Sequence, residues 1–298
     1  MAHSTVVVLG GSGLVGGCLT RRWVDRAEIV APSHAEVDVL DSRTLGAFLE
    51  HSGANTLVNL VAWADVDGAE PERGNTEGTV YGLNVEFPGR LAEQCRRLDV
   101  HLIHVSTDYV FDGTKVAAPY VEADSTRGLC WYAETKLRGE QAVLQANNTA
   151  CVARIEMPFT GHDHRKRDLA RTIVARLEHG QTIQGVTDQR ITPVFLDDAA
   201  EALWQLSIAR YAGLIHVAAS SWTTPFDLAH TIAERLQLPR ELIVPDTFEH
   251  FSGTRAVLRP QHSWLDVSHF TELFGAGILR PVHDELDAWT EQWNNATR

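Results

Sequence analysis

The sequence predicts an α/β fold built on a doubly wound parallel sheet, with a smaller C-terminal lobe. In the first half of the chain, short apolar segments alternate with amphipathic ones, which is the pattern of repeated βαβ units. Beyond about residue 155, loops lengthen, helical patterns dominate, and prolines and histidines become more frequent. We therefore expect a sheet domain over residues 1–155, joined by a return segment near 190–220, and a lobe made mainly of residues 156–298.

The individual elements follow from local patterns. Runs of apolar and β-branched residues predict strands at 5–9, 28–30, 56–60, 101–105, 150–155 and 214–217. Apolar residues spaced three and four apart predict helices at 14–24, 44–51, 79–98, 131–147, 169–178, 197–209 and 226–236. Connections between parallel strands share one hand, so these segments should wind into a single sheet.

Composition narrows the class of function. The formal net charge is −13, which disfavours nucleic-acid binding, because proteins that bind phosphate backbones concentrate Lys and Arg. No apolar run approaches the roughly 20 residues of a membrane span, and no basic stretch precedes an apolar one at the N-terminus. We therefore expect a cytoplasmic protein that binds neither nucleic acid nor membrane.

The cysteine and histidine patterns do not indicate a metal. The four cysteines form no C-x-x-C pair, and none of the 14 histidines lies in an H-E-x-x-H arrangement. His162 and His164 flank Asp163 in a polar stretch that we interpret as a loop. We expect reduced, buried cysteines and predict no metal site.

A glycine-rich turn follows the first predicted strand. Gly10, Gly13 and Gly16 give the pattern G-x-x-G-x-x-G between that strand and a helix. In this pattern the first glycine allows a tight exit from the strand, the second lets the backbone approach a pyrophosphate, and the third lets the helix pack closely. The helix start offers free N–H groups to the phosphates. The turn indicates a Rossmann domain that binds NAD(P), with Ser12, Leu14 and Val15 completing the loop.

The end of the second strand bears on the choice between NADPH and NADH. An acidic residue there binds the ribose hydroxyls of NAD and repels the 2′-phosphate of NADP. The tip instead contains Ser33 and His34, which tolerate a 2′-phosphate, although arginine is missing. We expect NADPH, with NADH as the alternative. Asp38 and Val39 are expected beneath the adenine if a strand ends there.

Tyr132 and Lys136 form a Y-x-x-x-K pair at the start of a predicted helix, and their spacing puts both side chains on one face. Reduction of a ketone needs a hydride and a proton for the alkoxide. A phenol has a pKa near 10, and a nearby ammonium lowers that pKa by favouring phenolate. Thr107, supported by Ser106, follows the strand at 101–105, where its hydroxyl would polarise a carbonyl. We predict Thr107, Tyr132 and Lys136 as catalytic, with Ser106, Tyr132 and Lys136 at the cofactor.

These residues together resemble the extended short-chain dehydrogenase/reductases, and among them the dTDP-4-dehydrorhamnose reductase family. The resemblance spans essentially the whole chain, and its most specific segment is S-T-D-Y-V-F-D-G at 106–113. Other matching segments are N-L-V-A-W at 59–63, L-N-V at 83–85, P-Y at 119–120, G-E at 139–140, D-Q at 188–189, T-P at 192–193 and R-P at 259–260. The resemblance implies an oxidoreductase whose C-terminal lobe binds a nucleotide-sugar. It places Ala62 and Trp63 at the cofactor, and Asp108, Tyr109 and Val110 at the substrate.

The chain departs from that family in two places. G-L-C-W at 128–131 stands where the family usually has P-L-N before the tyrosine, and Ala133 replaces a glycine after it. After the strand at 150–155 the family usually has R-T-S-W-V-Y-G, with its tryptophan near the sugar, whereas this chain has Glu156 and then Met157. We therefore assign Glu156 and Met157 to an altered substrate pocket. A related 4-keto-deoxysugar, or another small carbonyl compound, is as open as dehydrorhamnose.

Two other functions stay open at this point. The regulatory β subunit of methionine adenosyltransferase resembles the same family and also lacks the tryptophan, so a non-catalytic, regulatory NADP-binding protein is one alternative. A nucleotide-sugar epimerase or dehydratase is the other, although S-T-D-Y-V-F-D-G speaks against it. The sequence gives neither the exact substrate nor the oligomeric state, for which a homodimer is one option.

Overall fold

The computed structural model describes residues 4–296 of the chain. The chain divides into two compact units. Unit 1 consists of Met1–Val110, Thr126–Arg154 and Ala200–Ile215, and unit 2 of Phe111–Ser125, Ile155–Ala199 and His216–Arg298. Each unit is therefore assembled from segments that are far apart in the sequence.

A six-stranded sheet forms the centre of unit 1, with its strands in the order β2-β1-β3-β4-β5-β7. The bounds are β1 (Thr5–Leu9), β2 (Glu28–Val30), β3 (Thr56–Asn59), β4 (His101–Thr107), β5 (Cys151–Ile155) and β7 (Gly213–Val217). β1 pairs in parallel with β2 and β3, and β3 pairs in parallel with β4. The predicted strands are confirmed, and β4 continues beyond its predicted end at residue 105 to Thr107.

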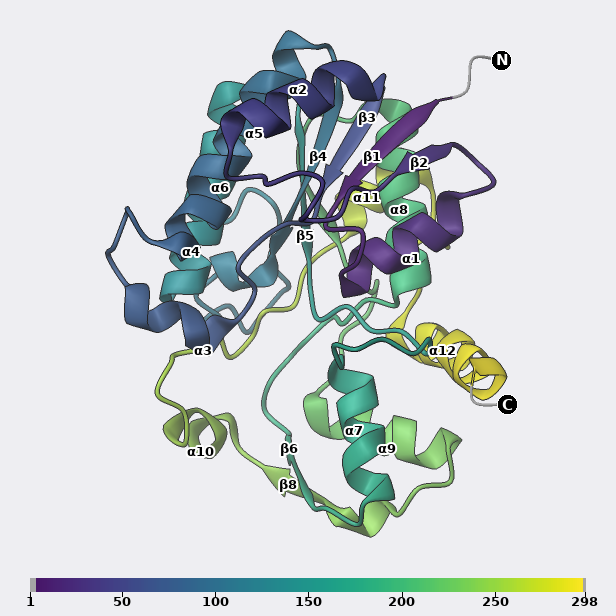
Figure 1. Ribbon diagram of the computed structural model, residues 1–298. Coiled ribbons are helices and arrows are strands. Elements are labelled where there is room, and N and C mark those ends of the chain that lie inside the picture. The colour runs from purple at the N-terminus through teal and green to yellow at the C-terminus, as the bar shows by residue number, and fades with distance from the viewer. Residues whose placement is uncertain (1–3, 297–298) are drawn as a thin grey trace. The chain divides into compact units, whose positions relative to one another are not determined.

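Helices cover both faces of this sheet (Figure 1). α1 (Leu14–Trp23) and α8 (Leu196–Ala209) lie on one face, and α2 (Ser42–Ser52), α5 (Phe87–Arg97) and α6 (Trp131–Ala146) lie on the other. On the first face, the rings of Trp23 and Trp204 pack with centroids 5.4 Å apart. On the second, Leu45, Phe87 and Val143 are buried in one apolar cluster with the strands. Burial on both faces explains why the central strands are largely apolar, as in the V-V-V-L run of β1. The doubly wound Rossmann fold is confirmed.

The long helix predicted at 79–98 is interrupted. It consists of α4 (Thr79–Tyr81), a π-helical turn at Gly82–Glu86, and α5. The amide of Asn84 in this turn is buried, where it accepts from Trp63 N at 2.8 Å and donates to Thr135 Oγ1 at 3.0 Å. Single π-helical turns are frequent at functional sites, and this one ties the segment after β3 to α6. A short helix, α3 (Val66–Ala69), lies between β3 and α4.

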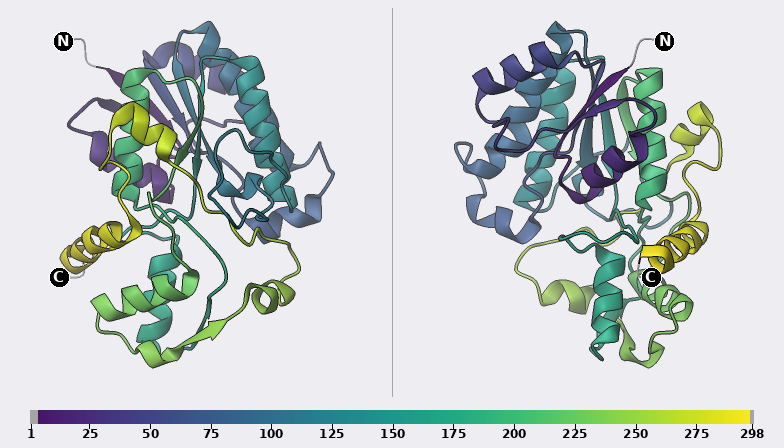
Figure 2. Two further views of the ribbon diagram at one scale, coloured as in Figure 1. Left: turned by 180° about the vertical axis from the view of Figure 1, so that it is seen from behind. Right: turned by 45° about the vertical axis from the view of Figure 1, so that its right-hand side comes forward.

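Unit 2 contains a small sheet that the sequence patterns did not reveal. β6 (Ile183–Val186) and β8 (Ile243–Asp246) pair in parallel, beside α7 (Leu169–Glu178) and α9 (Pro225–Arg235) (Figure 1, Figure 2). Each strand has four residues, and Gly185 lies opposite Pro245, so neither has a strong strand signal. The other helices are α10 (Phe248–Gly253), α11 (Ser268–Phe274) and α12 (Val282–Ala296).

Within residues 4–296, the helices are too short or too polar for any of them to cross a membrane.

Candidate active site

The winding of the unit 1 sheet reverses at β1, because β2 lies on one side of this strand and β3 on the other. In open α/β sheets, ligands bind beyond the carboxyl ends of the strands at such a point. The glycine loop follows β1 at this edge, Asn59 ends β3, and Thr107 ends β4. The topology therefore brings the predicted binding segments to one edge of the sheet.

The glycine loop has a backbone that requires glycine. Gly10 has a φ of +84°, in the left-handed region, and Gly13 N donates to Gly10 O at 2.9 Å. A Cβ on Gly16 would lie 2.3 Å from Gly10 O, so only glycine lets α1 start this close to the loop. Gly13 is the N-cap of α1, and within the described residues this helix has no side-chain cap and no acid in its first turn. Its first N–H groups, which follow Ser12 and include Leu14 and Val15, can therefore meet an anion.

The tip after β2 contains an acid that the sequence analysis missed. Ser33 N and Ser33 Oγ both donate to Glu36 Oε2 at 2.7 Å. These bonds from the backbone and then the hydroxyl lower the pKa of Glu36, so it carries negative charge. An acid at this tip favours the 2′-hydroxyl of NADH over the 2′-phosphate of NADPH. The spacing Ser-x-x-Glu, typical of a side chain that closes back on a turn, was the available signal.

The other residues predicted at this tip lie differently. His34 is exposed. The strand that would have placed Asp38 beneath the adenine is not formed, because residues 34–40 adopt turns and extended loop. Asp38 Oδ1 accepts from Leu40 N at 3.0 Å, which closes one of these turns. The side chain of Val39 is buried in the apolar cluster of unit 1, so it faces the core.

Thr107, Tyr132 and Lys136 meet where β4 ends and α6 begins. Because α6 starts at Trp131, Tyr132 and Lys136 occupy its first two turns on one face. Thr107 and Tyr132 are hydrogen-bonded, and Thr107 Oγ1 donates to Asp108 Oδ1 at 2.9 Å. Lys136 is buried, and its Nζ donates to Val105 O at 2.8 Å. The three predicted catalytic residues are thus in one place.

Burial shifts the titration of the tyrosine and the lysine in opposite directions. Desolvation raises the pKa of Tyr132 above its ordinary value, the hydrogen bond with Thr107 opposes this rise, and the charge of Asp108 adds to it. Desolvation lowers the pKa of Lys136 to about 8, against the opposing charge of Glu140. At neutral pH, Tyr132 therefore holds its proton while Lys136 stays charged, which is the state that a proton donor and its neighbour need.

A buried ion pair lies next to this lysine in the helix and sheet. Glu140, one turn after Lys136 on α6, accepts from Arg154 Nε at 2.9 Å and from Arg154 Nη2 at 2.7 Å. Both side chains are at most 3% exposed. In the sequence, Glu140 stands out only as part of the G-E segment that matches the family. Its signal was Arg154, a lone charge within an apolar strand, which needs a buried acid as partner.

Three further residues were predicted at the cofactor. Ser106 is buried, and within residues 4–296 its hydroxyl has no hydrogen-bond partner, which suits a position that takes a ligand group. Ala62 is partly buried. Trp63 is held by its backbone bonds to Asn84 and packs against the buried cluster of Ala69, Val80 and Trp131.

The predicted substrate residues of unit 1 differ in their neighbours. Asp108 and Tyr109 follow Thr107 directly, and the Tyr109 ring packs edge-on against Tyr132, with centroids 5.9 Å apart. Val110 is completely buried. Asp108 and Tyr109 therefore adjoin Thr107 and Tyr132, whereas the side chain of Val110 packs inside the protein.

Glu156 and Met157 lie in unit 2. Glu156 is fully buried, where Oε2 accepts from Thr192 N at 2.9 Å and from Thr192 Oγ1, and Oε1 accepts from Ser263 Oγ at 2.6 Å. These bonds account for an acid at this position without a ligand, and its contact with substrate stays a prediction. Met157 has a φ of +38°, which is rare for a residue other than glycine, and packs against the apolar core of unit 2.

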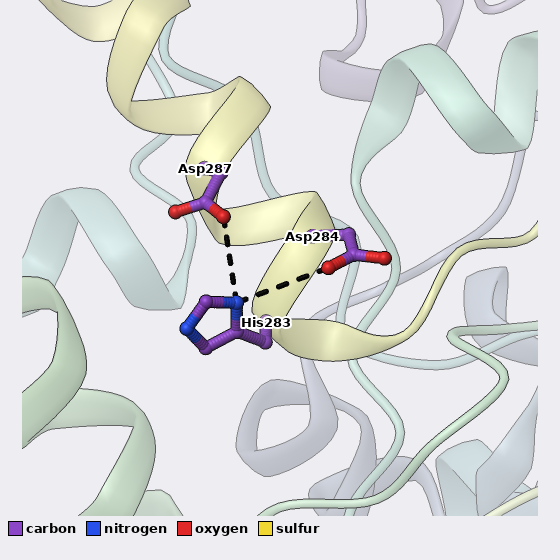
Figure 3. A group of neighbouring side chains, drawn as sticks. All are labelled: His283, Asp284 and Asp287. Atoms are coloured by element: carbon purple, nitrogen blue, oxygen red, sulfur yellow. Dashed lines mark ion pairs between the residues drawn. The ribbon is translucent and has the colours of Figure 1, made fainter.

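At the start of α12, His283, Asp284 and Asp287 form an exposed group (Figure 3). His283 Nδ1 lies 3.4 Å from Asp287 Oδ2 and 3.8 Å from Asp284 Oδ1. Asp287 also pairs with Arg235 at 2.8 Å. Exposed acidic groups are common without an ion, so this group alone does not identify a metal site.

Comparisons with known proteins agree with this geometry. The family model described as "RmlD substrate binding domain" matches residues 4–293. A probable dTDP-4,6-dihydroxy-2-methyloxan-3-one 4-ketoreductase from Streptomyces antibioticus is 34% identical over 292 residues, covering 96% of this chain and 93% of the relative. The dTDP-4-dehydrorhamnose reductase of Mycobacterium tuberculosis is 32% identical over 252 residues, covering 83% of this chain and 80% of the relative.

A solved structure gives the same fold. The dTDP-4-dehydrorhamnose reductase of Bacillus anthracis, determined in complex with NADP, superposes with a TM-score of 0.87 at 20% identity, covering 96% of this chain and 98% of the other. The sheet order, the glycine loop and the match of the family model over nearly the whole chain lead to one conclusion: the chain belongs to the RmlD substrate binding domain family.

Proposed function

We propose that this chain is an NADPH-dependent reductase of a nucleotide-linked 4-keto-deoxysugar, with Tyr132 as the proton donor. The observation that carries the proposal is the group formed by Thr107, Tyr132 and Lys136 at the sheet edge that also bears the glycine loop. The relatives named as reductases of dTDP-linked sugar ketones support the reaction and the substrate class.

The residues of unit 1 fit a nicotinamide cofactor. A Cβ on Gly13 would meet only Gly10 O within 4 Å, at 3.1 Å, so open space adjoins the uncapped start of α1, where a pyrophosphate would be held. The unpartnered hydroxyl of Ser106 and the ammonium of Lys136 offer donors to the nicotinamide half. NADPH supplies the hydride when bound, and the NADP of a solved relative supports that cofactor. Glu36 leads us to expect that NADH is used as well.

The catalytic residues divide the proton chemistry among them. Thr107 would hydrogen-bond the substrate carbonyl oxygen and hold it beside Tyr132. Tyr132 Oη donates its proton to that oxygen as the carbonyl carbon is reduced, and the charge of Lys136 stabilises the phenolate left behind. We also propose that the enzyme acts in the cytoplasm, where NADPH and nucleotide-sugars are available.

The test is oxidation of NADPH and of NADH, followed by absorbance, against a panel of dTDP- and UDP-linked 4-keto-sugars. We expect one sugar to support turnover, and we expect Tyr132→Phe to lose it by a factor of about 100 or more while NADPH affinity stays nearly unchanged. Retained turnover in Tyr132→Phe would overturn the assignment of the proton donor.

The alternative functions give different results in the same assay. Tight binding of NADPH without oxidation by any panel sugar would leave two functions: a reductase of another carbonyl compound, or a regulatory, cofactor-binding protein. Conversion of the sugar without net consumption of cofactor would identify an epimerase or dehydratase.

A further inference from the structure

Unit 2 contains a pocket that shares no residue with the catalytic group. Its volume is about 520 Å³, within the usual range for small-molecule pockets. Its walls come from the segment after β7, the segment that leads into α11, and the first half of α11, together with Pro119 and Thr192. All of these residues belong to unit 2, so the pocket is a property of that unit alone.

Two tryptophans form the main wall of the pocket. Trp264 is 6% exposed and Trp222 is 48% exposed. Their rings meet nearly at right angles, with an interplanar angle of 77° and centroids 6.0 Å apart. The exposed part of the Trp222 indole offers a flat apolar surface beside the pocket.

Arg190 holds this wall in place. Its guanidinium carbon lies 5.0 Å from the Trp222 ring centroid and 4.8 Å from that of Trp264, within cation–π distance of both. Arg190 Nη1 also donates to Val116 O, and Trp264 Nε1 donates to Lys115 O at 3.0 Å. Contacts with Arg190 and Trp264 therefore fix the orientation of the exposed Trp222 ring.

The polar part of the pocket consists of hydroxyls and carboxylates. Asp266 and Glu272 contribute two carboxylates, and the hydroxyls come from serines and threonines that include Ser221 and Thr271. Ser221 Oγ accepts from Val282 N at 3.0 Å, and its O–H remains able to donate to a ligand. Among the described lining residues, the carboxylates of Asp266 and Glu272 are the charged groups, and the guanidinium of Arg190 lies within cation–π distance of both indoles.

We propose that this pocket binds a pyranose sugar, and an amino sugar in its protonated form most tightly. The flat C–H face of a pyranose suits an exposed indole, whereas its ring hydroxyls can donate to the carboxylates and accept from the hydroxyls. A protonated amine gains a charge-assisted bond to Asp266 or Glu272. The lining carboxylates disfavour a phosphate or a diphosphate close to them, so we propose a ligand different from the nucleotide-linked substrate above.

The test uses the whole chain and saturation-transfer NMR with three probes: methyl glucosaminide, methyl glucoside and inorganic phosphate. We expect both sugars to receive magnetisation, the glucosaminide to bind more tightly, and phosphate not to compete. Trp222→Ala should weaken both sugars about tenfold, because the platform is lost. Glu272→Gln should reduce the preference for the glucosaminide and leave the glucoside nearly unchanged.

The matched control is Leu273→Ala, which removes an exposed side chain (49% exposed) from the same helix outside the pocket and should change neither sugar. Unchanged thermal unfolding and NADPH binding establish that each variant is folded. Absence of a signal from both sugars, or equal binding by Trp222→Ala, would refute the proposal, as would displacement of the sugars by phosphate. A change in molecular mass for Trp222→Ala by light scattering, without sugar binding, would show that the wall contacts a second copy instead.

Discussion

At the scale of single residues, the proposed active site contains a lysine that is buried yet charged at neutral pH. Lys136 Nζ has a fixed acceptor in Val105 O, and burial brings its pKa down to about 8. The charge of Glu140 works against that shift and is itself held by Arg154. Removal of the Glu140 charge would therefore make Lys136 lose its proton at lower pH.

We predict that kcat/KM for ketone reduction falls as the pH rises through about 8. Below this pKa Lys136 is charged and stabilises the phenolate of Tyr132, whereas above it the lysine is neutral and that stabilisation is lost. Steady-state rates across pH measure the decline. Lys136→Arg should lower the rate but lack the decline, because a guanidinium stays charged. A wild-type profile that is flat well above pH 8 would contradict this role.

The glycine loop permits a test with two adjacent residues of one helix. Gly16→Ala places a Cβ 2.3 Å from Gly10 O, so the loop must move, and we predict NADPH affinity at least about tenfold weaker. Gly17→Ala is the control, because the nearest atom to its Cβ is 3.8 Å away. It should bind NADPH normally and gain up to about 1 kcal/mol of helix stability. Equal cofactor affinities in fluorescence titrations would count against the loop assignment.

At the scale of secondary structure, sequence patterns predicted the bounds of those elements that depend on local residues alone. β1 and α7 have the predicted bounds because each has an uninterrupted apolar period. β6 and β8 were not predicted, because each becomes a strand by pairing with the other and has only a weak strand pattern of its own. The π-helical turn was not predicted either, because it depends on hydrogen bonds between Asn84 and two distant residues, Trp63 and Thr135, which are 21 and 51 positions away.

In the candidate active site, too, features set by local sequence were predictable, whereas contacts made on folding were not. The Thr107–Tyr132–Lys136 group was predictable from motifs, because the sequence pattern indicates both the end of β4 and the start of α6. Glu36 and the Glu140–Arg154 pair left only indirect signals in the sequence, because the partner of each charge is set by folding. The hydrogen-bond partners of Glu156 could not be predicted either, because Thr192 and Ser263 come from distant parts of the chain.

Glu156 joins the end of β5 to two other segments of unit 2. We predict that Glu156→Ala lowers the free energy of unfolding by about 3 kcal/mol, because Thr192 N, Thr192 Oγ1 and Ser263 Oγ lose a buried acceptor. Glu156→Gln, which keeps an acceptor, should cost less. Urea unfolding measures both variants. Equal stability of Glu156→Ala and wild type would show that these bonds are not the reason for the acid.

At the scale of the whole molecule, unit 2 buries an acid beside an existing ion pair. Glu285 of α12 accepts from Phe195 N at 2.9 Å, and Asp198 pairs with Arg280 Nη2 at 2.6 Å. Desolvation and then the charge of Asp198 raise the pKa of Glu285 well above its ordinary value, while Arg280 opposes the rise. The folded chain thus keeps a proton on Glu285 at pH values where the unfolded chain has released it.

We predict that the stability of the wild type falls relative to Glu285→Gln as the pH rises above 4.5, the ordinary value for this acid. Above this pH the folded state still binds a proton at Glu285 that the unfolded state has released. The free energy of unfolding therefore falls by up to about 1.4 kcal/mol per pH unit. Melting temperatures from pH 4 to 8 measure the difference. Glu291→Gln, an exposed change on the same helix, should show no such trend. A constant difference for Glu285→Gln would refute the raised pKa.

The late position of β7 has a consequence for synthesis on the ribosome. β5 pairs with β7, and Gly213 N donates to Ala150 O at 2.9 Å, so the last strand of the sheet lies some sixty residues after its neighbour. Until residue 217 has left the exit tunnel, a nascent chain displays the backbone of β5 as an unpaired edge. Such an edge can pair with another chain. We therefore expect the nascent chain to be open to pairing with other chains through β5 while this interval is translated.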